Sequence, residues 1–375
     1  MPAIRSIRWR PFRLALRSDA GAAHGSLSFR EGLLVVIEDE AGRIGLGEAS
    51  PLTSYAGGTV EECIQAIGLS TSALVGRTPE VAWSTPLRFR PGVSNGTRAA
   101  LACGIETALA DILARSEQLP LHVWLGGKAE SRSIPVNGLV DNPSTVEAAA
   151  EAKRLADAGF RTLKLKVGFD AATDAGRILA VREALDPGVA LRIDANGAWD
   201  ESIARAVLAV AASQGVSLAE QPVPPAAGPD AMARLRRCGV PIAADEGCRT
   251  VADFEALLRA DAMDAIVVKP MVSGLHEAIR LLAASRTAAI TTIVTTTFDS
   301  GVGVTLAAHL AATLPEPRPA CGLATHDRLA FDIVEGVPGI VAGDMRVGSA
   351  HGLGLELNAR ALDRAATGEW VEASS

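Results

Sequence analysis

The chain has 375 residues, of which 48% are hydrophobic and 21% are charged, and its formal net charge is -7. This length and composition predict a globular protein with one large domain or two ordinary domains. The negative net charge, with no block of basic residues, argues against nucleic acid and anionic membranes as partners.

The cysteines and the N-terminal segment bear on the cellular compartment. The five cysteines are scattered and form no C-x-x-C motif, so they predict neither a disulfide framework nor a zinc site. The segment from Met1 to Arg17 contains arginines but lacks the apolar core of a secretory signal. No apolar run is long enough for a membrane span. We therefore expect a cytoplasmic protein without a membrane partner.

Residues 1–130 are expected to form a separate module, in which strands come first and helices follow. Thr59, with Glu62 three residues later, is typical of a helix start, and an Ala-rich apolar stripe predicts a second helix over 95–113. The segments with strand patterns are 4–16, 32–38 and 42–47. This order predicts an α+β arrangement.

Strand and helix patterns alternate regularly over residues 131–325. Successive strands end at intervals of about 24 to 28 residues, and short strands at 134–137 and 321–325 bring the strand units to eight. Repeated βα units of this size close into a parallel, TIM-like barrel, and no Gly-rich dinucleotide turn follows a strand. Residues 326–375 return to a strand-like, Gly-rich pattern and are expected to pack back on the capping domain.

The stretch from Thr162 to Val167 alternates polar and apolar residues, so Lys164 and Lys166 point to one side of a strand. Two ammonium groups are costly in a plain core strand but suit a face that lines a polar cavity. There each lysine destabilises the charge of the other, and one could act as a base near neutral pH. The alternative is an edge strand with two solvated lysines, and this stretch alone does not decide.

Charged residues follow one barrel strand after another where each apolar strand stops. In a βα barrel these C-terminal strand ends form the active site. A single carboxylate there could be a helix N-cap or a solvated loop residue, but three in register between lysines favour one shared site. The residues are, in chain order, Lys164, Lys166, Asp194, Glu220, Asp245 and Lys269.

Three converging carboxylates would repel one another unless a cation joined them. Oxygen ligands with open coordination positions suit Mg²⁺, with Mn²⁺ as an alternative. Asn196 and Glu246 lie next to these carboxylates in sequence and are candidate outer partners of the ligands.

By strand order, Lys166 and Lys269 face each other across the mouth of the barrel. A small-molecule carboxylate bound between them would present its α-carbon to a lysine on either side. Removal of that proton creates a second negative charge, which the cation and Lys164 can stabilise.

Five short motifs end the barrel strands: Lys164-x-Lys166, Asp194-x-Asn196, Glu220-Gln221-Pro222, Asp245-Glu246 and Lys269-Pro270. With Gly47-Glu48-Ala49 and the helix from Asn95, they resemble the enolase superfamily, in its muconate-lactonising subgroup, over nearly the whole chain. The resemblance implies an α+β capping domain over a modified (β/α)7β barrel. It also implies that Asp194, Glu220 and Asp245 hold Mg²⁺.

Two further segments are similar to o-succinylbenzoate synthases of that subgroup. Residues 295–301 resemble their Ser-Ser-x-x-Glu-Ser segment with Asp299 in the place of Glu, and residues 321–325 resemble their Gly-Leu-x-Thr strand. Those enzymes dehydrate a succinyl-bearing cyclohexadiene carboxylate in menaquinone or phylloquinone synthesis. The resemblance implies that Lys166 removes the α-proton and then assists loss of hydroxide, while Lys269 contributes charge over the other face.

The substrate chain is expected to meet six residues around this site: Tyr55, Arg192, Thr296, Thr297, Asp299 and Gly322. The threonines fit a buried strand equally well by β-propensity. Tyr55, the single tyrosine, fits an exposed loop equally well. Five of the six histidines, His309 among them, are expected on the surface or in loops, and His122 is expected to be structural.

A racemase or epimerase of N-succinylamino acids, or a cycloisomerase of the same subgroup, remains open because both lysines are present. Dipeptide epimerases typically show Asp-x-Asp at the last strand to hold an ammonium group. The segment Ala324-Thr325-His326-Asp327 does not supply that pair in place. A non-catalytic barrel is disfavoured because every expected ligand and base is present. The oligomeric state cannot be inferred from these patterns.

Overall fold

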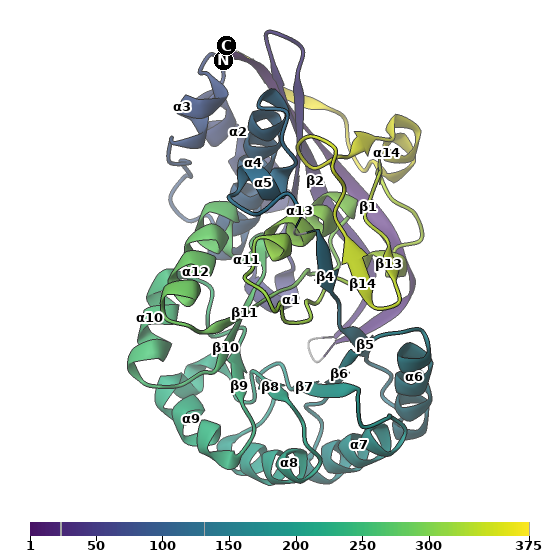
Figure 1. Ribbon diagram of the computed structural model, residues 1–375. Helices are drawn as coiled ribbons and strands as arrows, with labels where there is room; N and C mark the ends of the chain where they lie inside the picture. The colour runs from purple at the N-terminus through teal and green to yellow at the C-terminus, as the bar shows by residue number, and fades with distance from the viewer. Residues whose placement is uncertain (23–24, 131, 375) are drawn as a thin grey trace.

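The structure is a computed structural model that describes residues 1–22, 25–130 and 132–374. Figure 1 shows a ring of parallel strands surrounded by helices, and beside it an antiparallel sheet with its own helices. The two chain ends lie together at the sheet, because β16 (Val371–Ser374) pairs antiparallel with β1 (Ile4–Ala22).

The cap sheet has the strand order β16-β1-β2-β3, in which β2 spans Gly25–Asp39 and β3 spans Ile44–Ala49. Helix α4 (Asn95–Ser116) packs against β3, and glycines make the close approach possible. A Cβ at Gly45 or Gly47 would lie 2.0 Å or 1.9 Å from a carbonyl oxygen of α4. The other cap helices are α1 (Thr53–Ala56), α2 (Val60–Ser72), α3 (Pro79–Trp83) and α5 (Leu121–Trp124).

The barrel sheet is parallel, with seven strands in the order β11-β10-β9-β8-β7-β6-β5. This confirms the α/β class and the regular βα pattern expected from the sequence. Its strands are β5 (Gly138–Val140), β6 (Thr162–Lys166), β7 (Ala190–Asp194), β8 (Leu218–Glu220), β9 (Ile242–Ala244), β10 (Ala265–Val268) and β11 (Thr291–Val294).

Helices run around the outside of the ring (Figure 1). Several of their starts are stabilised by side chains that accept backbone N–H groups, as Ser144 does before α6. In the cap domain, the predicted cap Thr59 of α2 is confirmed. The barrel helices are α6 (Thr145–Asp157), α7 (Ala171–Glu183), α8 (Glu201–Ser213), α9 (Gly228–Leu235), α10 (Val251–Arg259), α11 (Pro270–Ser273), α12 (Leu275–Thr287) and α13 (Gly301–Ala312).

The ring is completed by short contacts rather than by a full eighth strand. Cys321 bridges to Val136, and Gly322 bridges to Thr295, both in parallel orientation. The strand expected at 134–137 is divided, because β4 (Ser133–Pro135) pairs instead with β14 (Asp344–Arg346), and the barrel strand β5 begins at Gly138.

The C-terminal segment contacts both parts of the molecule. The hairpin of β13 (Ile340–Val341) and β14 lies along β4, and β16 extends the cap sheet. The remaining elements are β12 (Val334–Glu335), β15 (Glu356–Leu357) and α14 (Ala359–Ala365). Within the described ranges, no helix has the length and apolar character needed to cross a membrane.

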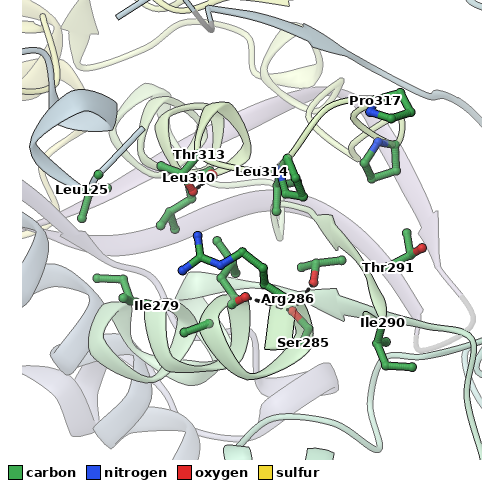
Figure 2. A pocket seen from close by; sticks show the side chains of 16 residues that line it. Leu125, Ile279, Ser285, Arg286, Ile290, Thr291, Leu310, Thr313, Leu314 and Pro317 are labelled. Atoms are coloured by element: carbon green, nitrogen blue, oxygen red, sulfur yellow. Dashed lines mark hydrogen bonds between the residues drawn. The ribbon is translucent and has the colours of Figure 1, made fainter. Parts of the chain in front are cut away.

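A hollow opens at the N-terminal ends of the barrel strands, between α12 and the end of α13 (Figure 2). Its walls combine apolar side chains, such as Leu282 and Leu310, with polar groups, and Arg286 extends across it. It contains none of the residues predicted to do chemistry, which lie at the opposite ends of the strands.

Candidate functional site

Strand register brings the predicted charged residues into one row. Lys166 lies beside Asp194, and Asp194 lies beside Glu220, on three neighbouring parallel strands. Asp245 and Lys269 directly follow β9 and β10. Side chains at paired positions of parallel strands point to the same face, so these groups meet at the C-terminal mouth of the barrel.

Lys164 joins two of the three carboxylates. Its Nζ lies 2.9 Å from Asp194 Oδ2 and 3.0 Å from Glu220 Oε1. Burial would lower the pKa of Lys164, but Asp194 and Glu220 outweigh it, and the net pKa lies above the usual range. The two carboxylates therefore outweigh any destabilisation of the Lys164 charge by the neighbouring Lys166.

The two carboxylates beside Lys164 respond in opposite directions. Burial alone would raise the pKa of Asp194, but Lys164 and Lys166 together lower it below its usual range. Burial, followed by the charge of Asp194, raises the pKa of Glu220 to about 7. The two ammonium groups thus favour the charged form of Asp194 more than that of Glu220, and a further positive charge beside Glu220 would stabilise its carboxylate.

Lys166 is supported by a chain of polar groups. Its Nζ donates to Asp194 Oδ2 at 2.7 Å and to Asn196 Oδ1 at 2.5 Å. Asn196 in turn donates from Nδ2 to Glu246 Oε1 at 2.9 Å. Asn196 therefore contacts the candidate base directly, and Glu246 accepts a hydrogen bond from Asn196. Both residues also lie next to the candidate ligands in the sequence.

Lys269 is supported from the cap. Its Nζ contacts Asp245 Oδ2 at 2.5 Å and the Tyr55 hydroxyl at 2.8 Å, and lies 4.0 Å from the centre of the Tyr55 ring. The Tyr55 hydroxyl also donates to Asp245 Oδ1. Burial, followed by the Asp245 charge, raises the pKa of Tyr55 well above its usual range. The sequence left open whether Tyr55 lines the pocket or lies in an exposed loop, and the structure places it in the pocket lining.

The donor set and its charge fit a hard divalent cation. Asp194, Glu220 and Asp245 are nearly fully buried oxygen donors on neighbouring strands, with an excess of negative charge at Glu220. In the part of the chain that the structure describes, no three such groups are close enough to hold a metal as they stand. Lys164 and Lys269 lie between the carboxylates, so metal binding requires these ammonium groups to move aside.

A pocket opens above these groups, lined by both barrel and cap residues. Of the predicted residues, it is lined by Tyr55, Lys164, Lys166, Asn196, Lys269, Thr296, Thr297 and Gly322. Thr296 Oγ1 lies 3.2 Å from the Gly322 carbonyl oxygen and 2.7 Å from Thr325 Oγ1. No Asp or Glu is among the described residues that line it.

Two predicted substrate contacts do not line this pocket. The Arg192 guanidinium donates to the Ala320 carbonyl at 2.8 Å, because two residues before a strand end lies one layer deeper in the barrel. Asp299 is 2% exposed, accepts from the Thr297 hydroxyl, and pairs with Arg30 of the cap at 3.7 Å. Asp299 thus positions Thr297 rather than reaching a ligand.

Several lining residues were not predicted: Leu52, Ser54, Asn137, Leu139, Thr295, Phe298, Ala324 and Thr325. Asn137 ends the strand expected at 134–137 and could have been found by the strand-end rule, whereas Leu139 lies within β5. Leu52 and Ser54 come from the cap, whose placement over the mouth has no local signal. Phe298 has a φ of 62°, a conformation that costs about 1–3 kcal/mol and is maintained only by its surroundings.

Comparisons with known proteins agree with this geometry. Residues 147–361 match the family described as Enolase C-terminal domain-like. The L-Ala-D/L-Glu epimerase of Bacillus subtilis is 31% identical over 315 residues, covering 81% of this chain and 81% of that protein. The o-succinylbenzoate synthase of Thermobifida fusca is 36% identical over 217 residues, covering 56% of this chain and 66% of that protein.

A solved structure gives the same result over the whole fold. The dipeptide epimerase from Enterococcus faecalis, complexed with Mg and the dipeptide L-Leu-L-Tyr, matches with a TM-score of 0.86 and 27% identity. The match covers 94% of this chain and 99% of that chain.

The epimerase matches extend over more of the chain than the synthase matches, so the expected special likeness to o-succinylbenzoate synthases is only weakly supported. The match to the Enolase C-terminal domain-like family covers more than half of the chain and establishes the family. This chain belongs to the enolase C-terminal domain-like family and is an enolase-superfamily enzyme of the muconate-lactonising subgroup.

Proposed function

We propose that this protein is a Mg²⁺-dependent o-succinylbenzoate synthase. The observation that carries the proposal is the charge of the pocket, whose described lining includes three lysines and no carboxylate. This lining suits a substrate with two carboxylates, one at the reacting carbon and one on the succinyl chain. It does not suit the free ammonium group of a dipeptide, which would need an anionic partner when buried.

Asp194, Glu220 and Asp245 would hold Mg²⁺, which when bound supplies positive charge to the substrate carboxylate during proton removal. The Lys166 side chain takes the α-proton from one side of the pocket. The electron pair of the broken C–H bond moves into the ring, and the C–O bond to the hydroxyl group breaks. Lys166 returns its proton to the departing hydroxide on the same side, so water leaves and the ring becomes aromatic.

The other end of the substrate would lie along the last strand units. Gly322 contributes no side chain there, and a Cβ would lie 2.8 Å from Thr295 Cγ2, so the pocket keeps its depth only with glycine. The hydroxyl groups of Thr296 and Thr325 stand beside it at 2.7 Å from each other. Neutral hydroxyl groups of this kind can accommodate the succinyl carboxylate without adding negative charge.

A second candidate is racemisation of N-succinylamino acids, which also carry two carboxylates. The observation that favours it is that Lys166 and Lys269 line the same pocket from separate strand ends. Two bases on opposite sides of an α-carbon can remove a proton on one side and return it on the other. The epimerases among the relatives make this reaction class reasonable.

The test is a direct assay of both reactions with Mg²⁺. We expect conversion of the succinyl-hydroxycyclohexadiene carboxylate to o-succinylbenzoate. The loss of the diene absorbance measures this conversion. In deuterated water, NMR of N-succinyl amino acids would report any α-proton exchange and inversion. Epimerisation of an unacylated dipeptide without any dehydration would overturn the proposal, because it would require an ammonium site that the lining lacks.

A further inference from the structure

One segment of the cap lies over the pocket with little support of its own. Residues 52–56, called the flap here, include helix α1 and contribute Leu52, Ser54 and Tyr55 to the pocket lining. Helix α1 has no buried residue and no side-chain cap at its N-terminus. A single helical turn with neither a core nor a cap is not stable by itself.

The chain is fixed on both sides of the flap. Before it, the Pro51 carbonyl accepts from Arg30 Nη1 at 2.7 Å, and the Ser50 N–H lies 3.1 Å from Met271 Sδ. After it, Gly57 touches α4 so closely that a Cβ on Gly96 would lie 2.0 Å from the Gly57 carbonyl oxygen. The flap is thus a short bridge between two anchored points.

Two barrel loops reach the flap at Tyr55. The Tyr55 side chain contacts Lys269 and Asp245, whereas its backbone carbonyl accepts from Arg249 Nη2 at 2.8 Å. The Arg249 guanidinium carbon also lies 5.4 Å from the centre of the Tyr55 ring. The contact to the carbonyl is independent of the Tyr55 hydroxyl and of the candidate metal ligands.

The backbone of Arg249 is itself firmly placed. Its N–H donates to Asp253 Oδ2 at 3.1 Å, next to the capping box in which Thr250 and Asp253 start α10. This cap uses the backbone of Arg249 and not its guanidinium group. The side chain can therefore be changed without removing the cap.

We propose that Arg249 is a positioning residue that fastens the flap across the mouth of the pocket, so that ligand entry and exit require this hydrogen bond to break. The inference rests on the proposed function only in taking this pocket as the substrate site. A charge-assisted hydrogen bond is among the stronger polar contacts, and losing it would increase the open fraction of the flap about tenfold.

The single tyrosine allows the flap to be observed without turnover. The enzyme is labelled with 3-fluorotyrosine, loaded with Mg²⁺, and its ¹⁹F signal is measured while a soluble gadolinium chelate is added. We expect slow broadening in the unaltered enzyme and about tenfold faster broadening in Arg249→Met, with Arg249→Lys in between. Arg259→Met is the matched control, since Arg259 is the last residue of the helix α10 that follows Arg249, and its side chain is exposed.

A second readout separates positioning from general loosening. With Mg²⁺ and o-succinylbenzoate as the probe, we expect faster ligand release and a raised KM in Arg249→Met, with kcat changed less and Tm near that of Arg259→Met. Equal ¹⁹F protection in Arg249→Met and the unaltered enzyme would overturn the inference. So would a fall in Tm that accounts for the lost protection. Failure of dehydration alone would overturn the proposed function and leave the ¹⁹F result intact.

Discussion

The barrel mouth and the seam between cap and barrel both bury carboxylates, but they neutralise them differently. At the mouth, Asp194 and Glu220 are bonded by lysine ammonium groups. At the seam, Glu48 of β3 is 1% exposed and is bonded by hydroxyl and backbone N–H groups of Ser50, Ser300 and Gly303. Similar acids thus have charged side-chain partners in one place and neutral hydroxyl and backbone partners in the other.

The seam is built as permanent structure. Ser300 and Gly303 form the start of α13, so Glu48 supplies a carboxylate to a helix N-terminus, where the helix dipole favours it. Burial, followed by the nearby Asp299, raises the pKa of Glu48, and Arg30 pairs with Asp299 beside it. The backbone donors cannot leave without unfolding the helix end.

The mouth is built for exchange. A lysine ammonium ends a flexible four-carbon chain, so it can turn away when a metal or a substrate arrives. The buried carboxylate of Glu48 at the seam is held by groups that belong to the fold. The carboxylates at the mouth could exchange their lysine partners for a metal ion or a substrate. Changes at the mouth should therefore affect activity, whereas changes at the seam should affect stability.

The largest expected effect is at Lys166. Lys166→Met removes the proposed base, and we expect kcat for dehydration to fall by at least about 10³-fold with the fold retained by circular dichroism. Lys153→Met is the control, because Lys153 lies exposed on α6 beside Asp157 at 3.3 Å. Dehydration within about tenfold of the unaltered enzyme would contradict the assignment of the base.

The next effect is at the seam. Glu48→Ala leaves the N–H groups of Ser300 and Gly303 without their acceptor, and we expect a loss of about 3 kcal/mol in the free energy of unfolding. Urea denaturation measures it, with exposed Glu369→Gln as the control. Glu48→Gln keeps one acceptor and should lose about half as much. A loss below about 0.5 kcal/mol would show that the seam does not need this carboxylate.

Binding of Mg²⁺ at the barrel mouth should affect stability as well as activity. If the mouth binds Mg²⁺ and the unfolded chain does not, a Mg²⁺ concentration 100 times the Kd should add about 2.7 kcal/mol to the free energy of unfolding. The measurement is Tm in MgCl₂ and in EDTA. Asp245→Asn should abolish the difference, while Asp157→Asn, on the barrel surface, should keep it. Identical Tm values in both buffers would argue against a metal at the mouth.

The smallest expected effect is a pH dependence of the free energy of unfolding, which arises outside both the barrel mouth and the seam. His309 is 1% exposed, which makes its expected surface placement wrong; its Nδ1 accepts from the His122 N–H at 3.1 Å. Burial, followed by His122, lowers the pKa of His309 to about 3. Below about pH 6.5, His309 binds a proton in the unfolded chain but stays neutral in the folded chain. The free energy of unfolding therefore decreases as the pH falls below about 6.5.

At pH 5 the loss from His309 should be about 2 kcal/mol relative to neutral pH. Urea denaturation at pH 7 and pH 5 measures it, and His309→Gln should remove that part of the pH dependence. An unchanged pH slope in His309→Gln would show that other groups cause the acid sensitivity.

Much of the row of charged residues at the barrel mouth could be predicted, because each of them is marked by the residues next to it in the sequence. An apolar strand that stops at a charged residue marks a strand end, and parallel strands put their ends on one side. Lys166, Asp194 and Glu220 therefore meet as expected. Arg192 was misplaced because a strand pattern gives the side to which a residue points but not its depth in the barrel.

The cap contributions could not be found in this way. Tyr55 and Arg249 are separated by almost two hundred residues in the chain, and nothing in either local sequence indicates their contact at 2.8 Å. The same holds for Glu48 and Ser300, which join different domains. Contacts of this kind depend on how two finished units dock.

The sequence by itself determined the repeating βα units, the helix starts and the order of charged strand ends, since each depends on residues close together in the chain. Only the tertiary structure decided which ammonium group contacts which carboxylate, which residues line the pocket, and which arginine donates a hydrogen bond to the flap. Those outcomes depend on the docking of the cap on the barrel and on side-chain distances, which periodicity and spacing do not encode.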